Sequence, residues 1–249
     1  MQKDLKDLAV VVNTHSSCTD VWPMFFGQLE KHLGKLQTYV FTNNEDGLPD
    51  YVSPVLYKEE DKYRTQYLNC LKSVREPFIL HLNEDYILYN DVDFSKIRSC
   101  LQVLATNREL CCVRFTRGPN FTNDKFRDGL HYLTHDKEYF FSQTAGLWNK
   151  DLLEKIHELG PDTHIGVNGA QYGHFEEDAN RVCKDLNLTG LIAYNDEPLR
   201  HNAAHHDSSI FPYIATAIVK GKWNLSEYSL ELLPLLEKYN IDPTRRGVY

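Results

Sequence analysis

The chain has 249 residues, of which 42% are hydrophobic and 25% charged, and this ordinary composition excludes wholesale disorder. Its 27 Lys and Arg against 35 Asp and Glu give a net charge of −8, so nonspecific nucleic-acid binding is not expected. No stretch approaches the roughly 20 apolar residues that span a bilayer, and the first residues do not resemble a signal peptide. Six cysteines without a C-x-x-C pair favour a reduced compartment. We therefore expect a cytoplasmic protein without a membrane span.

The first half of the chain alternates short apolar runs with amphipathic segments. The predicted strands are 8–13, 37–42, 55–57, 78–82 and 111–115. The predicted helices are 22–33, 63–74 and a third one that is capped by Asp93 and ends at residue 104. Strands separated by helices are typical of βα units. The sequence thus predicts an α/β fold whose mostly parallel central sheet carries helices on both faces.

The second half is less regular. A hairpin of 130–133 with 139–142, helices at 150–159, 175–186, 211–220 and 226–239, and a strand at 191–194 are expected. No repeat, low-complexity tract or Gly/Ser linker divides the chain. We therefore expect a single domain over 1–249, with a nucleotide-binding half (1–115) and a substrate-binding half (116–249).

Asn83, Glu84 and Asp85 follow the apolar strand 78–82 directly. In open α/β sheets ligands bind beyond the carboxyl ends of the strands. Two adjacent carboxylates there suit a hard divalent cation that bridges to phosphates. An acidic turn that only contacts solvent is the alternative for such a pair, but its place after a buried strand favours a functional site.

Glu176, Glu177 and Asp178 form a second acidic cluster at the start of a predicted helix. Acids in a first turn are common, because they interact favourably with the helix dipole. A carboxylate at this place could also act as a general base toward a hydroxyl group. Both interpretations remain open.

A His-rich run follows, in which His201 and His205 have the i, i+4 spacing of a zinc-binding pair. Asn202 stands where a zinc hydrolase of this type has its glutamate, so that chemistry is not expected. One imidazole could complete a site built on Asp85, or the run could be a polar loop. Walker A, G-x-G-x-x-G and G-x-S-x-G motifs are absent from the sequence.

The order of these features resembles GT-A type, nucleotide-sugar-dependent glycosyltransferases of the bacterial and viral polysaccharide type. The resemblance extends from Leu8 to about Trp223 and rests on short motifs. These are VVVNTHSS followed by DVWP, the Asn83–Asp85 run in place of the acidic D-x-D-like motif, FSQTAGLW, and Glu177–Asp178 with Lys184. Asn83 stands where a first Asp is common in the family.

The resemblance implies roles for particular residues. A divalent cation, Mn or Mg, would be held by Asp85 and His205, with Glu84 beside it, and Asp178 or Glu177 would be the catalytic base of an inverting enzyme. Donor contacts are expected from Asn13, Thr14, Asn43, Arg64, Asn83 and Glu84, and acceptor contacts from Gln143 and Trp148. The partners implied are a nucleotide-sugar donor and a saccharide or glycan acceptor.

Two other functions remain open. A metal-dependent sugar nucleotidyltransferase would use the same sheet and acids, but it usually has a Gly-rich basic loop after the first strand, and THSSCTDVW contains neither Gly nor Lys. A noncatalytic nucleotide- or sugar-binding protein is the alternative from a different class. A retaining enzyme would have no need of the base.

Overall fold

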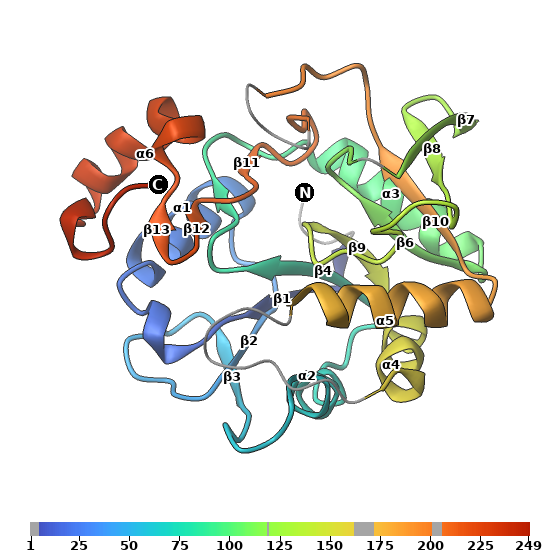
Figure 1. Cartoon of the computed structure of the whole chain (residues 1–249), viewed down its shortest axis with the longest axis horizontal. Helices are drawn as coiled ribbons and strands as arrows, with labels where there is room; N and C mark the ends of the chain where they lie inside the picture. The colour runs from blue at the N-terminus through green and yellow to red at the C-terminus, as the bar shows by residue number, and fades with distance from the viewer. Residues whose placement is uncertain (1–4, 119, 162–171, 201–205) are drawn as a thin grey trace.

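The computed structural model of the chain describes residues 5–118, 120–161, 172–200 and 206–249. Nine strands from both halves of the chain form one sheet, in the order β3-β2-β1-β4-β9-β6-β10-β8-β7 (Figure 1). The strands are β1 (Leu8–Asn13), β2 (Thr38–Thr42), β3 (Ser53–Leu56), β4 (Phe78–Asn83), β6 (Leu110–Arg114), β7 (Phe121–Arg127), β8 (Leu130–Leu133), β9 (Gly146–Asn149) and β10 (Thr189–Ala193). All except β8 and β9 point in one direction, which confirms the predicted α/β class.

Helices cover both faces of the sheet. They are α1 (Trp22–Leu33), α2 (Tyr63–Leu71), α3 (Phe94–Thr106), α4 (Lys150–Leu159), α5 (Tyr172–Asp185) and α6 (Leu225–Lys238). The first, third and sixth pack in a core with Val10 and Val12 of β1, whereas the others pack in a core with Ala9 and Val11. Because neighbouring side chains of a strand point to opposite faces, the two groups of helices lie on opposite sides of the sheet. Among the helices of the described residues, none is both long and apolar enough to cross a membrane.

Two local signals that the sequence contains act as expected. Gly34 ends α1 with a φ of 76°, a conformation that glycine adopts without steric cost. Asp93 caps α3, since its side chain accepts hydrogen bonds from the backbone N–H groups of Ser95 and Lys96. The bounds of both helices therefore follow from residues next to them in the chain.

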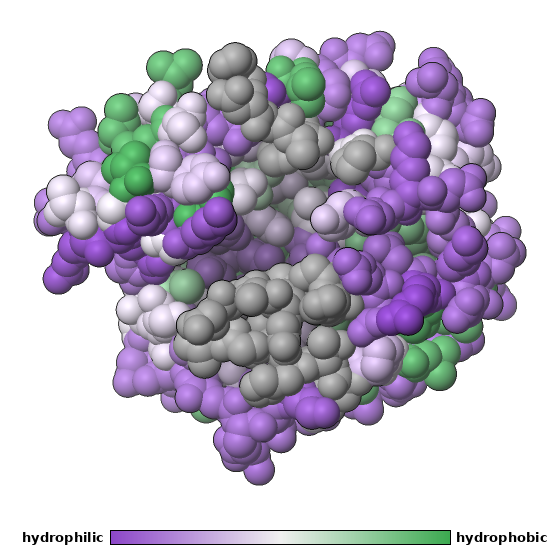
Figure 2. Space-filling model, viewed as in Figure 1, coloured by the Kyte–Doolittle hydropathy of each residue, from purple (hydrophilic) through white to green (hydrophobic). Residues whose placement is uncertain are grey.

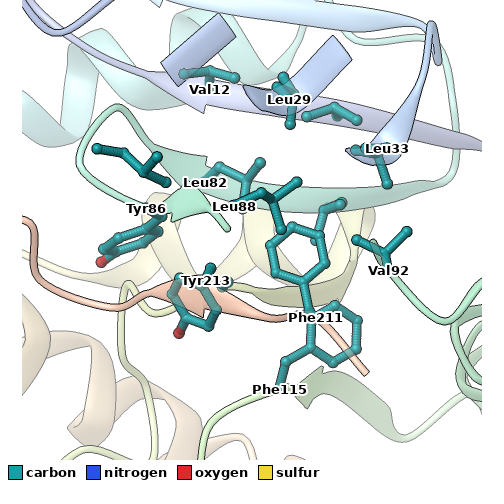
Figure 3. Close-up of a cluster of buried hydrophobic side chains, with 14 of the residues drawn as sticks. Val12, Leu29, Leu33, Leu82, Tyr86, Leu88, Val92, Phe115, Phe211 and Tyr213 are labelled. Atoms are coloured by element: carbon teal, nitrogen blue, oxygen red, sulfur yellow. The ribbon is translucent and has the colours of Figure 1, made fainter. Parts of the chain in front are cut away.

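The segment after β4 is held by the C-terminal half of the chain. Its short strand β5 (Ile87–Leu88) pairs antiparallel with β11 (Tyr213–Ile214). Figure 3 shows Leu88 beside Phe211 and Tyr213, and Phe211 beside Phe115. The rings of Phe115 and Phe211 stack with their centroids 5.5 Å apart. This apolar cluster anchors the turn that carries Glu84 and Asp85.

The predicted hairpin of 130–133 with 139–142 is wrong. Leu130–Leu133 pairs with Phe121–Arg127 and with β10, and 139–142 forms no strand. The Tyr139 carbonyl instead accepts hydrogen bonds from the side chains of Arg114 (2.7 Å) and Asn120 (2.6 Å). Side-chain N–H groups thus donate to a backbone carbonyl that would accept from a neighbouring strand if this segment were part of a hairpin.

The predicted helix at 211–220 is also wrong. The segment contains β11 and a hairpin of β12 (Ile218–Val219) with β13 (Lys222–Trp223). Lys220 and Gly221 turn this hairpin with φ angles of 49° and 78°. Pairing of Tyr213 and Ile214 with β5 favours the extended form. Tertiary pairing therefore overrides the apolar helical spacing.

Candidate active site

A topological switch point lies between β1 and β4. The chain leaves β1 to form β2 on one side and, after β3, returns to form β4 on the other side. The last residues of the two strands, Asn13 and Asn83, are register partners. Loops that diverge from such a point leave a crevice, which is where α/β sheets bind ligands. The space-filling view shows this face of the molecule hollowed near its middle (Figure 2).

The loop after β1 is braced from two directions. Thr14 accepts a hydrogen bond from the Trp22 indole N–H at its Oγ1 (2.9 Å). Asn43, at the end of β2, accepts the backbone N–H of Ser16 and donates to the Ser16 hydroxyl, both at 2.8 Å. Asn13, Thr14 and Asn43 thus gather at one edge of the sheet, as expected, and their contacts with a donor stay predictions.

Glu84 and Asp85 lie side by side at the end of β4 and are partly buried. Burial raises the pKa of the Glu84 carboxyl, and Cys18 and Thr14 lie within hydrogen-bond reach of it. The pKa of Asp85 is raised well above its usual range by burial and by the charge of Glu84. Two adjacent desolvated carboxylates are stabilised in their ionised form by a cation.

The residues at this edge fit a hard cation in their chemistry. Beside the two carboxylates, the buried Oδ1 of Asn83 has no hydrogen-bond partner among the described residues. Oxygen donors of this kind are the ligands that Mg²⁺ and Mn²⁺ prefer. Within the described residues no cluster of three His, Cys, Asp or Glu side chains could hold a metal ion. His205, the expected second ligand of Asp85, lies outside the described residues, so this pairing stays a prediction.

Gln143 links the ends of β1 and β4. Its side-chain amide donates to the Tyr63 hydroxyl (2.6 Å), and its backbone carbonyl accepts from the Tyr86 hydroxyl (2.6 Å). Asn13 in turn donates to Tyr63 (3.5 Å), and Asn83 to Tyr86 (3.2 Å). Only 9% of the surface of Gln143 is exposed, and its hydrogen bonds connect the ends of β1 and β4. Its predicted contact with an acceptor stays a prediction.

A carboxylate from α5 joins this network. Glu176 accepts the backbone N–H of Gln143 at its Oε1 (2.8 Å). Burial raises the pKa of Glu176. The charges of Asp85 and Glu176 both raise the pKa of the buried Tyr86, which places this ring near both carboxyl groups. A carboxylate with a raised pKa, close to a crevice, has the properties of a general base.

The two acids predicted as the base lie differently. Glu177 is exposed, and Asp178 is buried and forms an ion pair with Arg181, one turn further along α5. The helix begins at Tyr172, so the acidic cluster lies beyond the first turn and does not cap the helix. The assignment of the base to Glu177 or Asp178 stays a prediction, and Glu176 is the carboxylate that the Gln143 network holds.

Two predicted contact residues are structural. Trp148 lies in the middle of the sheet on β9 with 1% of its surface exposed, so it packs in the core and does not present a face to an acceptor. Arg64 is buried on α2 and donates to the carbonyls of Ile156 (3.0 Å) and His157 (3.2 Å) at the end of α4. Each side chain is buried in packing between elements that are distant in the chain, and the contacts of Trp148 with an acceptor and of Arg64 with a donor stay predictions.

One basic residue near the site escaped the sequence analysis. Arg246 forms a two-pronged ion pair with Asp20, 226 positions away in the chain. Its charge also lowers the pKa of Glu84. No local motif surrounds Arg246, so only the folded chain reveals that it lies beside the acidic pair.

No protein-family profile and no curated protein matches the sequence. Among solved structures, a cytidylyltransferase from Leptospira borgpetersenii is similar over 96% of this chain and 97% of its own, with 11% identity and a TM-score of 0.48. A mannosyltransferase from Pyrobaculum calidifontis, solved with GDP-Man and Mn²⁺, is similar over 78% of this chain and 58% of its own, with 11% identity and a TM-score of 0.46. TarS 1–349 of S. aureus is similar over 94% of this chain and 64% of its own, with 12% identity and a TM-score of 0.44. Such low scores and identities do not decide between these classes of enzyme.

Proposed function

We propose that this protein is a glycosyltransferase that moves a sugar from a nucleotide-sugar donor to a hydroxyl group of a saccharide or glycan acceptor. The donor would bind in the crevice between β1 and β4, with Asn13, Thr14 and Asn83 at its walls. The observation that carries the proposal is the placement of Glu84 and Asp85 at this switch point, directly beyond the register pair of Asn13 and Asn83.

Glu176 is the residue that we assign to proton removal. Gln143 holds it near Tyr86 and hence near the acidic pair. A base at this place would take the proton of the acceptor hydroxyl as its oxygen bonds to the anomeric carbon. The bond from that carbon to the diphosphate breaks in the same displacement, and the nucleoside diphosphate leaves. Such a reaction inverts the anomeric configuration.

The same site supports a role for a divalent cation. Asp85 and Glu84 would hold it, and the partnerless Oδ1 of Asn83 lies at the same edge. Bound there, Mn²⁺ or Mg²⁺ would neutralise the negative charge of the diphosphate leaving group.

A sugar nucleotidyltransferase is the second candidate, since such an enzyme would bind its nucleotide at the same end of the sheet and a divalent cation at the same acidic residues. The loop after β1 favours the glycosyltransferase, because its residues Thr14–Cys18 contain neither glycine nor lysine. A buried carboxylate at Glu176 adds to this preference, because an acceptor hydroxyl requires a base, whereas a sugar phosphate is already an anionic nucleophile.

A calorimetric screen of UDP-, GDP-, CMP- and ADP-sugars, with and without MnCl₂, tests the proposal. We expect one class to bind, more tightly with Mn²⁺, and Asp85→Ala to remove the part of the affinity that depends on the metal. Asp50→Ala, at an exposed position outside the hydrogen-bond network described for the site, is the control and should bind as the wild type does. Release of a nucleoside diphosphate during transfer would identify a glycosyltransferase, and release of pyrophosphate from a nucleoside triphosphate and a sugar phosphate would identify a nucleotidyltransferase. Failure to bind any nucleotide would overturn both.

A further inference from the structure

The C-terminal residues lie against β13 and are held there by the backbone. The N–H of Trp223 donates to the carbonyl of Gly247 (3.0 Å), and the N–H of Tyr249 donates to the carbonyl of Trp223 (2.9 Å). The short helix η3 (Pro243–Arg245) precedes this segment, and Asp242 caps it. Arg246 therefore stands between a capped helix and a bridge to Trp223, and its backbone position is fixed from both sides.

The Arg246 side chain reaches from this segment to the loop after β1. Its Nε donates to Oδ2 of Asp20 (2.6 Å) and its Nη2 to Oδ1 of the same residue (2.5 Å). Nη2 also donates to the carbonyl of Ser17 (3.3 Å). The thiol of Cys18 also lies within hydrogen-bond reach of the guanidinium, which has five N–H donors in all, and 16% of the side chain remains exposed. The guanidinium is thus oriented by Asp20 with donors left over.

Contacts of the loop after β1 place the guanidinium next to the acidic pair. Nη2 bonds to the Ser17 carbonyl of this loop, and the thiol of the next residue, Cys18, lies within hydrogen-bond reach of both the guanidinium and the Glu84 carboxyl. Glu84 and Asp85 would repel a diphosphate unless positive charge lies next to them. A planar guanidinium offers paired N–H donors that match phosphate oxygens, and it stays charged in any protein environment.

We propose that Arg246 binds the diphosphate group of the nucleotide ligand and that Asp20 is its positioning residue. The proposal deepens the function proposed above and rests on it. In this arrangement the C-terminal segment closes the crevice on the side of the β1 loop. The diphosphate would then lie between the acidic pair with its cation and the guanidinium.

Calorimetry of the full-length protein with UDP, GDP, CDP and ADP, and with the matching nucleosides, tests this role. The nucleotide that binds the wild type best is compared across Arg246→Ala, Arg246→Lys and Asp20→Asn. We expect Arg246→Ala to weaken diphosphate binding about tenfold or more, because charge-assisted hydrogen bonds are lost. The nucleoside, which has no phosphate, should bind all variants alike. Arg246→Lys, which keeps the charge without the planar fork, should fall between alanine and the wild type.

Arg245→Ala is the matched control, since its exposed side chain precedes Arg246 directly. It should leave the diphosphate affinity unchanged. If the wild type binds a nucleoside diphosphate and both Arg246 variants bind it equally well, the role of Arg246 is refuted and the proposed function stands. If the wild type binds no nucleotide, the proposed function itself is refuted and the inference falls with it. Thermal unfolding of each variant separates a lost contact from a lost fold, and the lysine variant keeps the test decisive where the alanine variant unfolds.

Discussion

Three consecutive acids on α5 have three different environments. Glu176 is held by the Gln143 backbone and is mostly buried, Glu177 is exposed, and Asp178 pairs with Arg181. The environment of a carboxyl group, more than its residue type, sets its pKa and hence its suitability as a base. At the scale of single residues, the chemistry of this cluster therefore depends on which acid the Gln143 network holds.

Glu176→Gln is expected to reduce the turnover of sugar transfer by roughly 100-fold or more, because the amide cannot take a proton. The variant keeps an oxygen for the N–H of Gln143, so nucleotide binding should be retained. The raised pKa of Glu176 has a sign that can be checked. Since the base must be ionised, the rate should fall on the acid side at a higher pH than for an ordinary glutamate, and a pH profile of the turnover measures this.

Glu177→Gln and Asp178→Asn are the matched variants for this comparison. Glu177 is exposed, and its amide should leave turnover close to that of the wild type. If Asp178→Asn abolishes turnover and Glu176→Gln does not, the base is Asp178, as the family resemblance implies, and the assignment to Glu176 is refuted.

At the scale of elements, β9 decides how the two halves of the chain join. It lies between β4 and β6 and runs antiparallel to both. At its start, a Cβ on Gly146 would lie 3.0 Å from the Val113 carbonyl oxygen, tighter than nearly all Cβ contacts, so glycine favours this close approach of the backbones. The motif FSQTAGLW therefore ends in a central strand, and its tryptophan belongs to the core.

Trp148→Ala should destabilise the protein by about 3–5 kcal/mol, because it removes a large side chain that is fully buried. Urea or guanidinium denaturation of the purified protein measures this difference. Trp148→Phe, which retains an aromatic ring, should lose clearly less. A variant with wild-type stability and a raised KM for the acceptor would show instead that Trp148 contacts the acceptor, as the sequence suggested.

At the scale of the whole molecule, one sheet separates two hydrophobic cores, and the cysteines illustrate how completely these are enclosed. All six cysteines are free thiols, and five are buried, whereas Cys18 in the loop after β1 is partly exposed. Burial and the nearby Glu84 raise the pKa of Cys18 to about 12, which leaves little reactive thiolate at neutral pH.

Titration with a disulfide reagent should therefore find one slowly reacting thiol in the native protein and six after denaturation. Cys18→Ser should remove the native reaction and leave five thiols in denaturant. Rapid reaction of several thiols in the native state would contradict the enclosed cores.

The sequence by itself determined the elements whose signals are local. Short apolar runs predict β1 and β4, Gly34 ends α1, and Asp93 begins α3, because each depends on residues a few positions apart. The position of Glu84 and Asp85 after a buried strand was visible for the same reason. From these parts the α/β class followed, as did the edge of the sheet where the site was expected.

Only the tertiary structure decided which side chains meet at that edge. Trp148 and Arg64 have the chemistry of ligand contacts, yet packing with distant elements buries them. Glu176 enters the site through a hydrogen bond to Gln143, and Arg246 through an ion pair across almost the whole chain. Contacts between residues so far apart in sequence arise from the folding of the sheet and its helices, and no local pattern of residues encodes them.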